Sequence, residues 1–276
     1  MADSSETIVT SHLCLEYDSR RVLNDISFAV PKGAVVGLVG RNGAGKTSLL
    51  RCLVGLATPC TGESHLLGCS SLALIDSVRD RIGYVAQTPD LFEWMDVQEH
   101  LRTIGRAYSR WNEYRCFLLA MRLELPLRCA VGKLSFGDKQ KLAVVLALAH
   151  DPDVLLLDEP VSSLDPLTRR EFMRSLFSER VDRTIILSSH LLSDLERVVS
   201  HVAFLRSGRL QLFDAWDSLL EHLRFVEVSE SEVPRSAVVC GHGVKSGCVV
   251  DTRLAPELAG SGQPLALDDL FVVLNQ

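Results

Sequence analysis

A short glycine-rich stretch has the residue types and the spacing to bind phosphate. Residues 40–48 match the pattern G-x-x-x-x-G-K-[ST], with Gly40, Gly45, Lys46 and Thr47 at the fixed positions. Glycines allow positive φ angles, so backbone N–H groups can approach phosphate oxygens closely. The lysine would reach the terminal phosphates, and the threonine hydroxyl would ligate magnesium. The stretch predicts a nucleoside-triphosphate site. Its expected binding residues are Gly40, Arg41, Asn42, Gly43, Ala44, Gly45, Lys46, Thr47 and Ser48.

The segments on either side of this stretch favour the same interpretation. Residues 35–39 are an apolar run typical of a short buried strand, and residues 47–54 predict a helix with a polar first turn. Strand, turn and helix together aim consecutive N–H groups at one point, where the positive end of the helix dipole also lies. An ordinary turn that matches the pattern by chance is therefore the less favoured alternative.

Two adjacent acidic residues follow a second apolar run. Residues 154–157 predict a fully buried strand, and Asp158 and Glu159 stand at its carboxyl end, where doubly wound sheets bind ligands. In a magnesium–nucleotide site the aspartate would hold the ion, directly or through water, and the glutamate would orient and deprotonate the attacking water. Taken alone, the pair is equally typical of a solvated strand end. Its place downstream of a phosphate-binding stretch favours catalysis.

Composition and length are those of an ordinary globular protein. The 276 residues are 47% apolar and 23% charged. The net charge of −6 argues against nucleic-acid binding over the whole surface, although not against a local basic patch. Eight cysteines without a C-x-x-C pair predict reduced thiols in a cytosolic protein. The N-terminal residues lack the features of a signal peptide, and the longest apolar run, 142–149, is too short to span a bilayer. We expect a protein that is soluble by itself, which leaves docking onto a membrane partner open.

The rest of the chain alternates between predicted strands and helices. Strands are expected at 7–17, 21–30, 63–67, 81–86, 183–187, 201–206 and 209–213, and helices at 139–149, 166–178, 191–199 and 215–223. Residues 90–135 differ, because apolar and aromatic side chains recur at helical spacing and predict two or three inserted amphipathic helices. Ser135 is a candidate cap of the next helix. After about residue 224 the signal weakens. Short strands are expected at 224–229, 236–240 and 247–251, and a helix at 265–274.

Seven positions along the chain carry residues or motifs suited to a nucleotide site: Tyr17, residues 40–48, Gln87, residues 134–138, residues 155–160, residues 163–165 and His190. In this order they resemble the motifs of ATP-binding cassette (ABC) ATPases. The resemblance covers roughly residues 5–220. It implies an α/β P-loop NTPase cassette with a mixed core sheet, an antiparallel β subdomain, an α-helical subdomain at about 90–135 and a small C-terminal α+β appendage. The implied domains are an ABC ATPase at 1–223 and an accessory domain at 224–276.

The resemblance implies a role for each matching residue. Tyr17 would stack on adenine, although its position alone slightly favours a packed aromatic at a strand end. Gln87 would contact magnesium and the attacking water, in a loop that senses a membrane partner. Glu159 would be the catalytic base, His190 would contact the γ-phosphate, and Asp165 would communicate across a dimer. The implied catalytic residues are Lys46, Glu159 and His190, and the implied magnesium ligands are Thr47, Gln87 and Asp158.

The signature segment departs from the family pattern. The family has Leu-Ser-Gly-Gly-Gln, and this chain has Phe136 and Asp138 in place of the first glycine and the glutamine. The Ser135 hydroxyl and the amides of Phe136 and Gly137 can still bind a γ-phosphate at the helix start. The extra negative charge of Asp138 makes direct contact of its side chain with phosphate unfavourable. The resemblance implies that the signature of one cassette completes the ATP site of a second one, in a head-to-tail homodimer or heterodimer.

Two C-terminal segments, residues 224–228 and 267–271, resemble the appendage of cassettes from bacterial multidrug, bacitracin and lantibiotic-resistance exporters. Residues 139–141, after the signature, resemble the same group. A generic accessory domain is the alternative for the C-terminal part. The resemblance to ABC ATPases implies an ATP-hydrolysing transporter subunit that uses ATP and Mg²⁺, works through a separate permease and lies on the inner face of the membrane. The resemblance to exporters implies that the transport is export. Helices in 90–135 would dock the permease, although core packing is the favoured role of each aromatic there. The alternative is a non-transport ABC ATPase on ribosomes or DNA. Such proteins usually carry paired cassettes, coiled-coil insertions or zinc cysteines, which this sequence lacks, so no nucleic-acid partner is expected.

Overall fold

The centre of the molecule is a six-stranded sheet in the order β10-β9-β3-β8-β7-β6. Its strands are β3 (Val35–Val39), β6 (Ile82–Val85), β7 (Val154–Asp158), β8 (Thr184–Ser189), β9 (His201–Arg206) and β10 (Arg209–Ala215). Neighbours from β9 to β6 are parallel, whereas β10 returns antiparallel to β9. Alternate residues of β7 enter two different apolar clusters, one on each face of the sheet. The continuous apolar run 154–157 is therefore explained, because a parallel sheet is covered on both faces.

A second sheet packs over one of these faces. It is antiparallel in the order β2-β1-β4-β5, with β1 (Glu6–Tyr17), β2 (Arg20–Pro31), β4 (Thr61–Leu66) and β5 (Cys69–Ser70). Helix α1 (Lys46–Leu53) buries Leu49, Leu50 and Leu53 in the cluster that this sheet shares with the central sheet. The sequence predicted the β1–β2 pair and the helix to within one residue at most ends. It missed the two-residue strand β5 and the short helix α2 (Asp76–Arg79).

The segment between β6 and β7 folds as the predicted insertion of helices. Helices α3 (Val97–Gly105) and α4 (Glu113–Arg122) precede α5 (Phe136–Ala149), and one-turn 3₁₀ helices lie at Ser71–Ala73, Val131–Lys133 and Pro256–Leu258. Helix α5 begins three residues earlier than expected, because Ser135 caps it. The expectation that each aromatic of this segment is core was wrong for Trp94 and Phe117, which are 76% and 53% exposed.

The C-terminal part forms a third sheet with its own small core. Helix α7 (Trp216–His222) runs directly into β11 (Leu223–Val226), followed by β12 (Val238–Gly241), β13 (Cys248–Asp251) and β14 (Gln263–Pro264). The strand order is β12-β13-β11-β14, and all pairs are antiparallel. The buried residues of this core are Val226, Val233, Ala237, Cys248, Val250 and Ala255.

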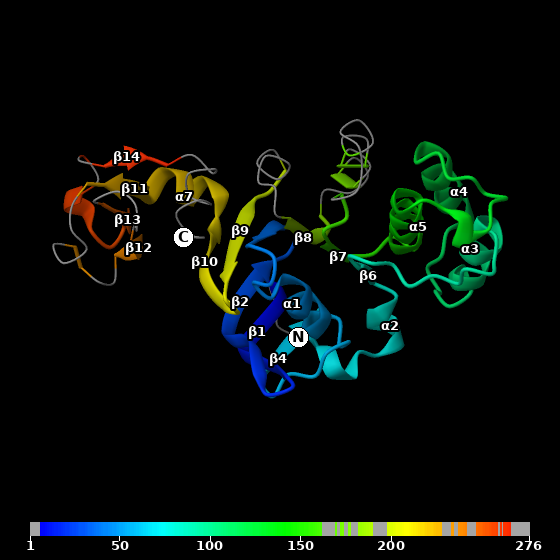
Figure 1. Cartoon of the computed structure of the whole chain (residues 1–276), viewed down its shortest axis with the longest axis horizontal. Coiled ribbons are helices and arrows are strands. Elements are labelled where there is room, and N and C mark those ends of the chain that lie inside the picture. The colour runs from blue at the N-terminus through cyan, green and yellow to red at the C-terminus, as the bar shows by residue number, and fades with distance from the viewer. Residues whose placement is uncertain are drawn as a thin grey trace.

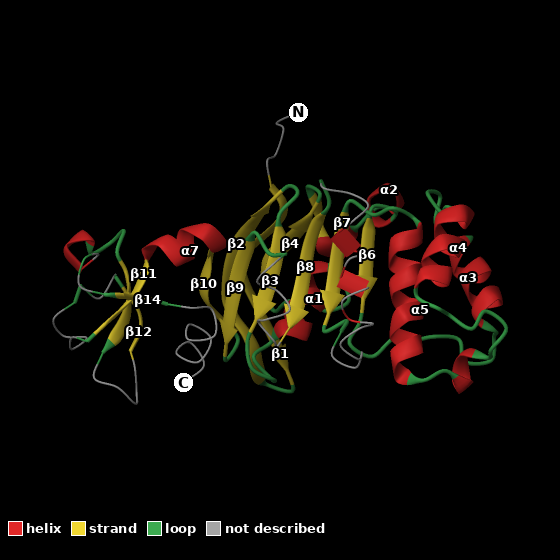
Figure 2. Ribbon diagram, turned by 90° about the horizontal axis from the view of Figure 1, so that it is seen from above, coloured by secondary structure: helices red, strands yellow, loops and turns green. Residues whose placement is uncertain are grey.

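The computed structural model describes residues 6–161, 169, 172–173, 176–177, 182–189, 198–227, 233–234, 237–241, 247–258, 260 and 262–265. Most of the expected helices 166–178 and 191–199, and nearly all of 265–274, lie outside these residues. Figures 1 and 2 show α3, α4 and α5 at one end of the molecule, β11–β14 at the other, and the two larger sheets between them. Within the described ranges, no helix is both long enough and apolar enough to cross a membrane.

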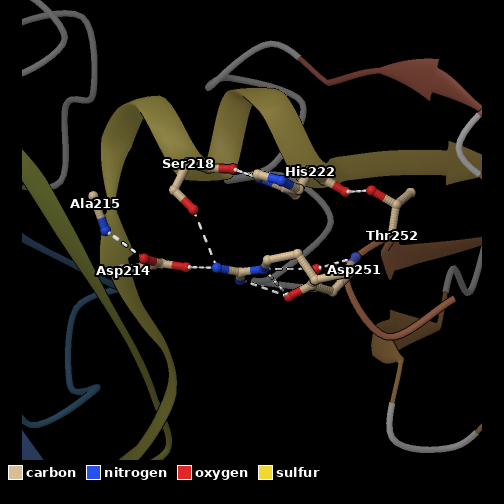
Figure 3. Close-up of polar contacts among 7 residues, drawn as sticks. Asp214, Ala215, Ser218, His222, Asp251 and Thr252 are labelled. Carbon is tan, nitrogen blue, oxygen red and sulfur yellow. Dashed lines mark hydrogen bonds and ion pairs between the residues drawn. The ribbon is translucent and has the colours of Figure 1, made fainter. Parts of the chain in front are cut away.

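An arginine joins the C-terminal sheet to the central sheet. Arg253 forms 2.6 Å ion pairs with Asp214 of β10 and with Asp251 of β13, and it donates to Ser218 Oγ of α7 at 3.1 Å. In Figure 3 the side chains of Asp214, Ser218 and Asp251, which come from β10, α7 and β13, point toward one region. Burial by itself raises the pKa of Asp251, but the hydrogen bonds and charge of Arg253 outweigh burial, so the pKa is lowered. The carboxylate is therefore held in its charged form.

The described cysteines carry free thiols, as the sequence predicted. Cys14, Cys52, Cys116 and Cys248 are buried, and the last three belong to the apolar clusters of the protein. Burial raises the pKa of Cys52 to about 11 and that of Cys116 to about 12. These two thiols are protonated core side chains at neutral pH and are poor nucleophiles.

Candidate functional site

The glycine-rich stretch forms the turn between β3 and α1. Helix α1 begins at Lys46, and its N-cap Gly45 has a φ angle of 108°, which side chains rarely adopt. A Cβ atom on Gly40 would lie 2.3 Å from the carbonyl oxygen of Leu205 on β9. The turn can therefore fit against the central sheet only with glycine at both positions. It leaves the first N–H groups of α1 without partners inside the helix.

A cleft of about 200 Å³ opens at this turn. It is lined by Val22, Asn42, Gly43, Ala44, Gly45, Lys46, Thr47, Ser48, Gln87 and Glu159. Residues from three predicted motifs, which lie far apart in the sequence, therefore meet in one cavity. The N-terminus of α1 contributes a positive dipole end and backbone donors, which suit a phosphate group.

A lysine and a glutamate meet across the cleft. The Lys46 ammonium donates to the carbonyl oxygen of Gly40 at 2.8 Å and lies 3.3 Å from Oε1 of Glu159. Both side chains are buried, at 5% and 8% exposure. Because burial lowers the local dielectric, these charges act more strongly on a bound group than they would in water. The structure thus places a fixed cation and a candidate base side by side.

The acidic pair is positioned by the next strand of the sheet. Ser188 of β8 donates to Oδ1 of Asp158 at 2.8 Å and accepts from the Glu159 N–H at 2.8 Å. Asp158 is completely buried, and its Oδ2 has no hydrogen-bond partner among the described residues. A buried, unpartnered carboxylate oxygen fits a divalent cation or a water molecule bound to one. Glu159 has a φ angle of 45°, an uncommon backbone conformation that is concentrated at functional sites.

A family model described as ABC transporter matches residues 23–162, which contain the glycine-rich turn and the acidic pair. The chain belongs to the ABC transporter family. It is an ATP-binding subunit with the fold and the ATPase class that its motifs predicted.

Curated relatives agree with this membership. The chain is 32% identical over 240 residues to the bacitracin transport ATP-binding protein BcrA of Bacillus licheniformis, covering 85% of this chain and 78% of the relative. It is 35% identical to the Nod factor export ATP-binding protein I of Burkholderia orbicola (strain AU 1054), covering 74% of this chain and 69% of the relative. Both relatives are named as ATP-binding proteins of transport or export systems.

Solved structures share the fold. An ATP-binding subunit of an ABC transporter superposes with a TM-score of 0.71 and 29% identity, over 77% of this chain and 91% of that chain. A bacterial Atm1-family ABC exporter with ATP bound has a TM-score of 0.67 and 25% identity, over 80% of this chain and 41% of that chain. A dimeric post-hydrolysis cassette bound to ADP and Pi has a TM-score of 0.67 at 22% identity, over 75% of this chain and 98% of that chain.

In this ABC ATPase the signature segment lies apart from the cleft. Ser135 is the N-cap of α5, where its Oγ accepts from the Asp138 N–H at 3.1 Å and donates to Oδ2 of Asp138 at 2.7 Å. Phe136 is 45% exposed. Ser135, Phe136 and Gly137 do not line the cleft. A single chain therefore does not bring the signature to its own glycine-rich turn in this structure.

The remaining predicted site residues either do not line the cleft or lie outside the described residues. Gly40 accepts from Lys46, but neither Gly40 nor Arg41 lines the cleft. Tyr17 ends β1, is 45% exposed, and also lies outside the cleft lining. Asp165 and His190 lie outside the described residues, so their predicted roles stay predictions.

A second, larger cavity of about 490 Å³ lies between the central sheet and the helices. It is lined by Arg51, Leu56, Tyr84, Ala86, Thr88, Pro89, Asp90, Leu91, His100, Ile104, Tyr108, Ala143, Leu146 and Ala147. We call it the helical groove. Ala86 and Thr88 line the groove, whereas Gln87 between them lines the cleft at the glycine-rich turn. One short segment therefore borders both cavities.

His100 is a buried ionisable residue in the lining of this groove. Its Nε2 accepts from the Phe92 N–H at 3.1 Å, and its ring lies 5.4 Å from the ring of Phe92. Burial lowers the pKa of His100, so the ring is neutral at physiological pH. A neutral ring keeps the Phe92 N–H paired and thereby holds the chain that enters α3.

Sequence reasoning missed the role of Ser188. Ser188 directly follows the predicted strand 183–187, and in the structure it contacts both members of the acidic pair. The available signal was its place at the carboxyl end of a predicted parallel strand, because such ends meet at one edge of a sheet. The neighbouring order of β7 and β8 was needed to assign the contact.

Proposed function

We propose that this ABC ATPase binds ATP with magnesium in the cleft, hydrolyses it there, and thereby drives export through a separate membrane permease. The observation that carries the proposal is the meeting of the glycine-rich turn, Lys46 and Glu159 in one cleft, with 3.3 Å between the lysine and the glutamate. A phosphate site beside a buried carboxylate has the parts that phosphoryl transfer to water requires.

Each side chain then has a defined task. The amides of residues 43–48 and the Lys46 ammonium hold the phosphates. Glu159 accepts a proton from the attacking water, and Ser188 fixes its backbone. Magnesium would be held by Thr47, Gln87 and Asp158, and it would neutralise the negative charge of the phosphate oxygens. His190 would contact the γ-phosphate, and Tyr17 would stack on adenine.

The proposed working unit is a head-to-tail pair of cassettes. The N-terminus of α5 would bring Ser135 and the amides of Phe136 and Gly137 to the γ-phosphate held by the other cassette, and Asp165 would communicate between the two. The separation of the signature from the cleft within one chain supports this arrangement. Since both halves of each site are needed, ATP binding closes the pair and hydrolysis reopens it.

The helical groove is the proposed docking place of the permease. Its lining combines apolar and polar side chains, and it shares the segment around Gln87 with the cleft. A permease segment in the groove would therefore press on the residue that borders the nucleotide. Docking would hold the cassette at the inner face of the membrane, with residues 1–223 as the ATPase domain and 224–276 as an accessory domain. The names of the bacitracin and Nod factor relatives support export.

Glu159→Gln tests the catalytic assignment. The amide keeps the shape of the side chain but is a far weaker base, so hydrolysis should fall at least about 100-fold. ATP binding should persist, and a stable dimer should accumulate with ATP, as measured by light scattering after gel filtration. Unchanged hydrolysis would exclude Glu159 as the base.

Co-purification tests the transport assignment. The full-length protein, extracted with detergent from its native membrane, should bring down an integral membrane protein. If it instead sediments with ribosomes or DNA and brings down no membrane subunit, the transport proposal is wrong.

A further inference from the structure

The signature serine already has a hydrogen-bond acceptor within its own helix. Its hydroxyl donates to Oδ2 of Asp138 at 2.7 Å, and the other oxygen of this carboxylate lies 3.3 Å from the ammonium of Lys141. The Asp138 side chain is 30% exposed and the Lys141 side chain 14% exposed. A carboxylate therefore holds the hydroxyl that would otherwise donate to a phosphate.

We propose that the Asp138 carboxylate competes with the γ-phosphate for the Ser135 hydroxyl. The carboxylate must move away from Ser135 before the ATP-bound dimer can close. This inference rests on the proposed head-to-tail dimer, and it describes how closure of that dimer around ATP is regulated. A hydroxyl has one proton and can donate it to one strong acceptor at a time. The Asp138 carboxylate and a γ-phosphate are both anionic acceptors for the same proton, and they also repel each other.

The neighbouring lysine provides the position to which Asp138 moves. Lys141 already contacts Oδ1, so a rotation of the carboxylate away from Ser135 exchanges one partner without leaving the charge unpaired. Closure of the dimer then costs the free energy of the Ser135–Asp138 hydrogen bond, which is broken. The consequence is a dimer that closes at a higher ATP concentration than it would with a neutral side chain at this position.

A purely structural role for Asp138 predicts something different. Ser-x-x-Asp at a helix start resembles a capping box, whose loss would destabilise α5. In that case removal of the charge would leave the ATP dependence of dimerisation unchanged or would weaken dimerisation.

The test measures ATP-driven dimerisation in the Glu159→Gln background by analytical ultracentrifugation. Asp138→Asn keeps the shape and removes the charge, and a neutral acceptor forms a weaker hydrogen bond. The ATP concentration for half-maximal dimer should therefore fall about five- to tenfold. Glu93→Gln is the matched control. It removes one negative charge that pairs with Lys139, a residue of the same helix as Asp138, and no contact of Glu93 with Ser135 is involved. It should cause no comparable fall.

A second variant separates the hydroxyl contact from general effects. The Ser135→Ala variant lacks the hydroxyl for which Asp138 and the phosphate compete. In that variant, Asp138→Asn should lower the ATP concentration for half-maximal dimer much less. The proposed competition is wrong if Asp138→Asn lowers the ATP concentration for half-maximal dimer equally with and without the Ser135 hydroxyl. It is also wrong if Asp138→Asn and Glu93→Gln change that concentration equally. If the Glu159→Gln parent does not dimerise with ATP, the proposed dimer fails and the competition fails with it. If the parent dimerises and Asp138→Asn causes no shift, the competition alone is wrong.

Discussion

At the residue scale, the chemistry of the cleft depends on pairs of buried side chains. Lys46 lies against Glu159, and Ser188 contacts both Asp158 and the backbone of Glu159. Buried polar groups that lose a partner carry the full cost of desolvation, so these contacts hold the acidic pair in one geometry. A fixed geometry is what electrostatic stabilisation of a transferring phosphoryl group requires.

Lys46→Ala should abolish tight nucleotide binding. The phosphates lose a charge-assisted hydrogen bond, which corresponds to roughly 10- to 100-fold weaker affinity. Fluorescence titration with a labelled ATP analogue measures this change. Lys32→Ala, which removes an exposed positive charge outside the cleft, is the control and should bind normally. Normal binding by the Lys46 variant would remove the loop lysine from the site.

Ser188→Ala should lower both stability and hydrolysis. It leaves the Glu159 N–H and Oδ1 of Asp158 without their shared partner, which costs about 1–3 kcal/mol in the free energy of unfolding. Ser71→Ala is the matched control, because Ser71 is also buried but its hydroxyl has no hydrogen-bond partner in the described part of the chain. Urea denaturation and steady-state ATPase assays compare the two. Equal effects of both variants would contradict the assigned role of Ser188.

At the element scale, the segment after β6 couples two cavities. Ala86 and Thr88 line the helical groove and Gln87 lines the cleft, while Gln140 of α5 donates to the carbonyl oxygen of Ala86 at 3.4 Å. A displacement of this segment by an occupant of the groove would therefore alter the cleft. The same contact ties it to α5, whose N-terminus carries the signature.

Leu56→Arg should disrupt permease docking without harming the isolated ATPase. Leu56 lines the groove and is 67% exposed, so a charged side chain there leaves the fold intact but opposes the burial of an apolar partner. Leu72→Arg is the control, since Leu72 is 54% exposed and lies outside the groove lining. Co-purification with the membrane subunit should fall at least about tenfold for Leu56→Arg alone. Equal retention in both variants would place docking elsewhere.

At the scale of the whole molecule, the C-terminal sheet is joined to the central sheet by α7 and by Arg253. The arginine contacts Asp214, Ser218 and Asp251, which belong to three different elements. Thr252 adds a hydrogen bond from its hydroxyl to the carbonyl oxygen of His222 at 2.9 Å. These contacts hold the small sheet against the end of α7 and β10.

Arg253→Met should loosen this junction. It keeps much of the aliphatic volume but leaves two carboxylates without their cation, at a cost of roughly 1–3 kcal/mol in the free energy of unfolding. Limited proteolysis should then cleave between the central sheet and the C-terminal sheet sooner than in the wild type. ATP binding should be unaffected, because none of the junction residues lines the cleft. An unchanged cleavage pattern would show that Arg253 does not hold the junction.

The same junction predicts a pH dependence. The folded-state pKa of Asp251 is lowered, so its stabilising contribution is complete above its ordinary pKa of about 4 and is lost as pH falls through the lowered value. Thermal unfolding of the wild type should therefore show a loss of stability in acid that Arg253→Met shows to a smaller extent. An identical pH profile for the two proteins would contradict this assignment.

The sequence by itself predicted the nucleotide site and determined the family. The glycine pattern, the apolar strands and the acidic pair are local features, because backbone freedom and strand burial depend mostly on neighbouring residues. The order of the motifs then predicted the α/β cassette, which the family match and the solved structures confirm. Local patterns also located the main strands and the inserted helices.

The tertiary structure decided which side chains meet. Helical spacing could not tell the exposed face of α4, with Phe117 and Met121, from its buried face, because both faces carry apolar residues. The contact of Ser188 with the acidic pair required the pairing of β7 with β8. The hydrogen bond from Ser135 to Asp138 could be identified only from the side-chain conformations of both residues at the start of α5. Such contacts depend on how distant segments and side chains pack, which residue spacing does not encode.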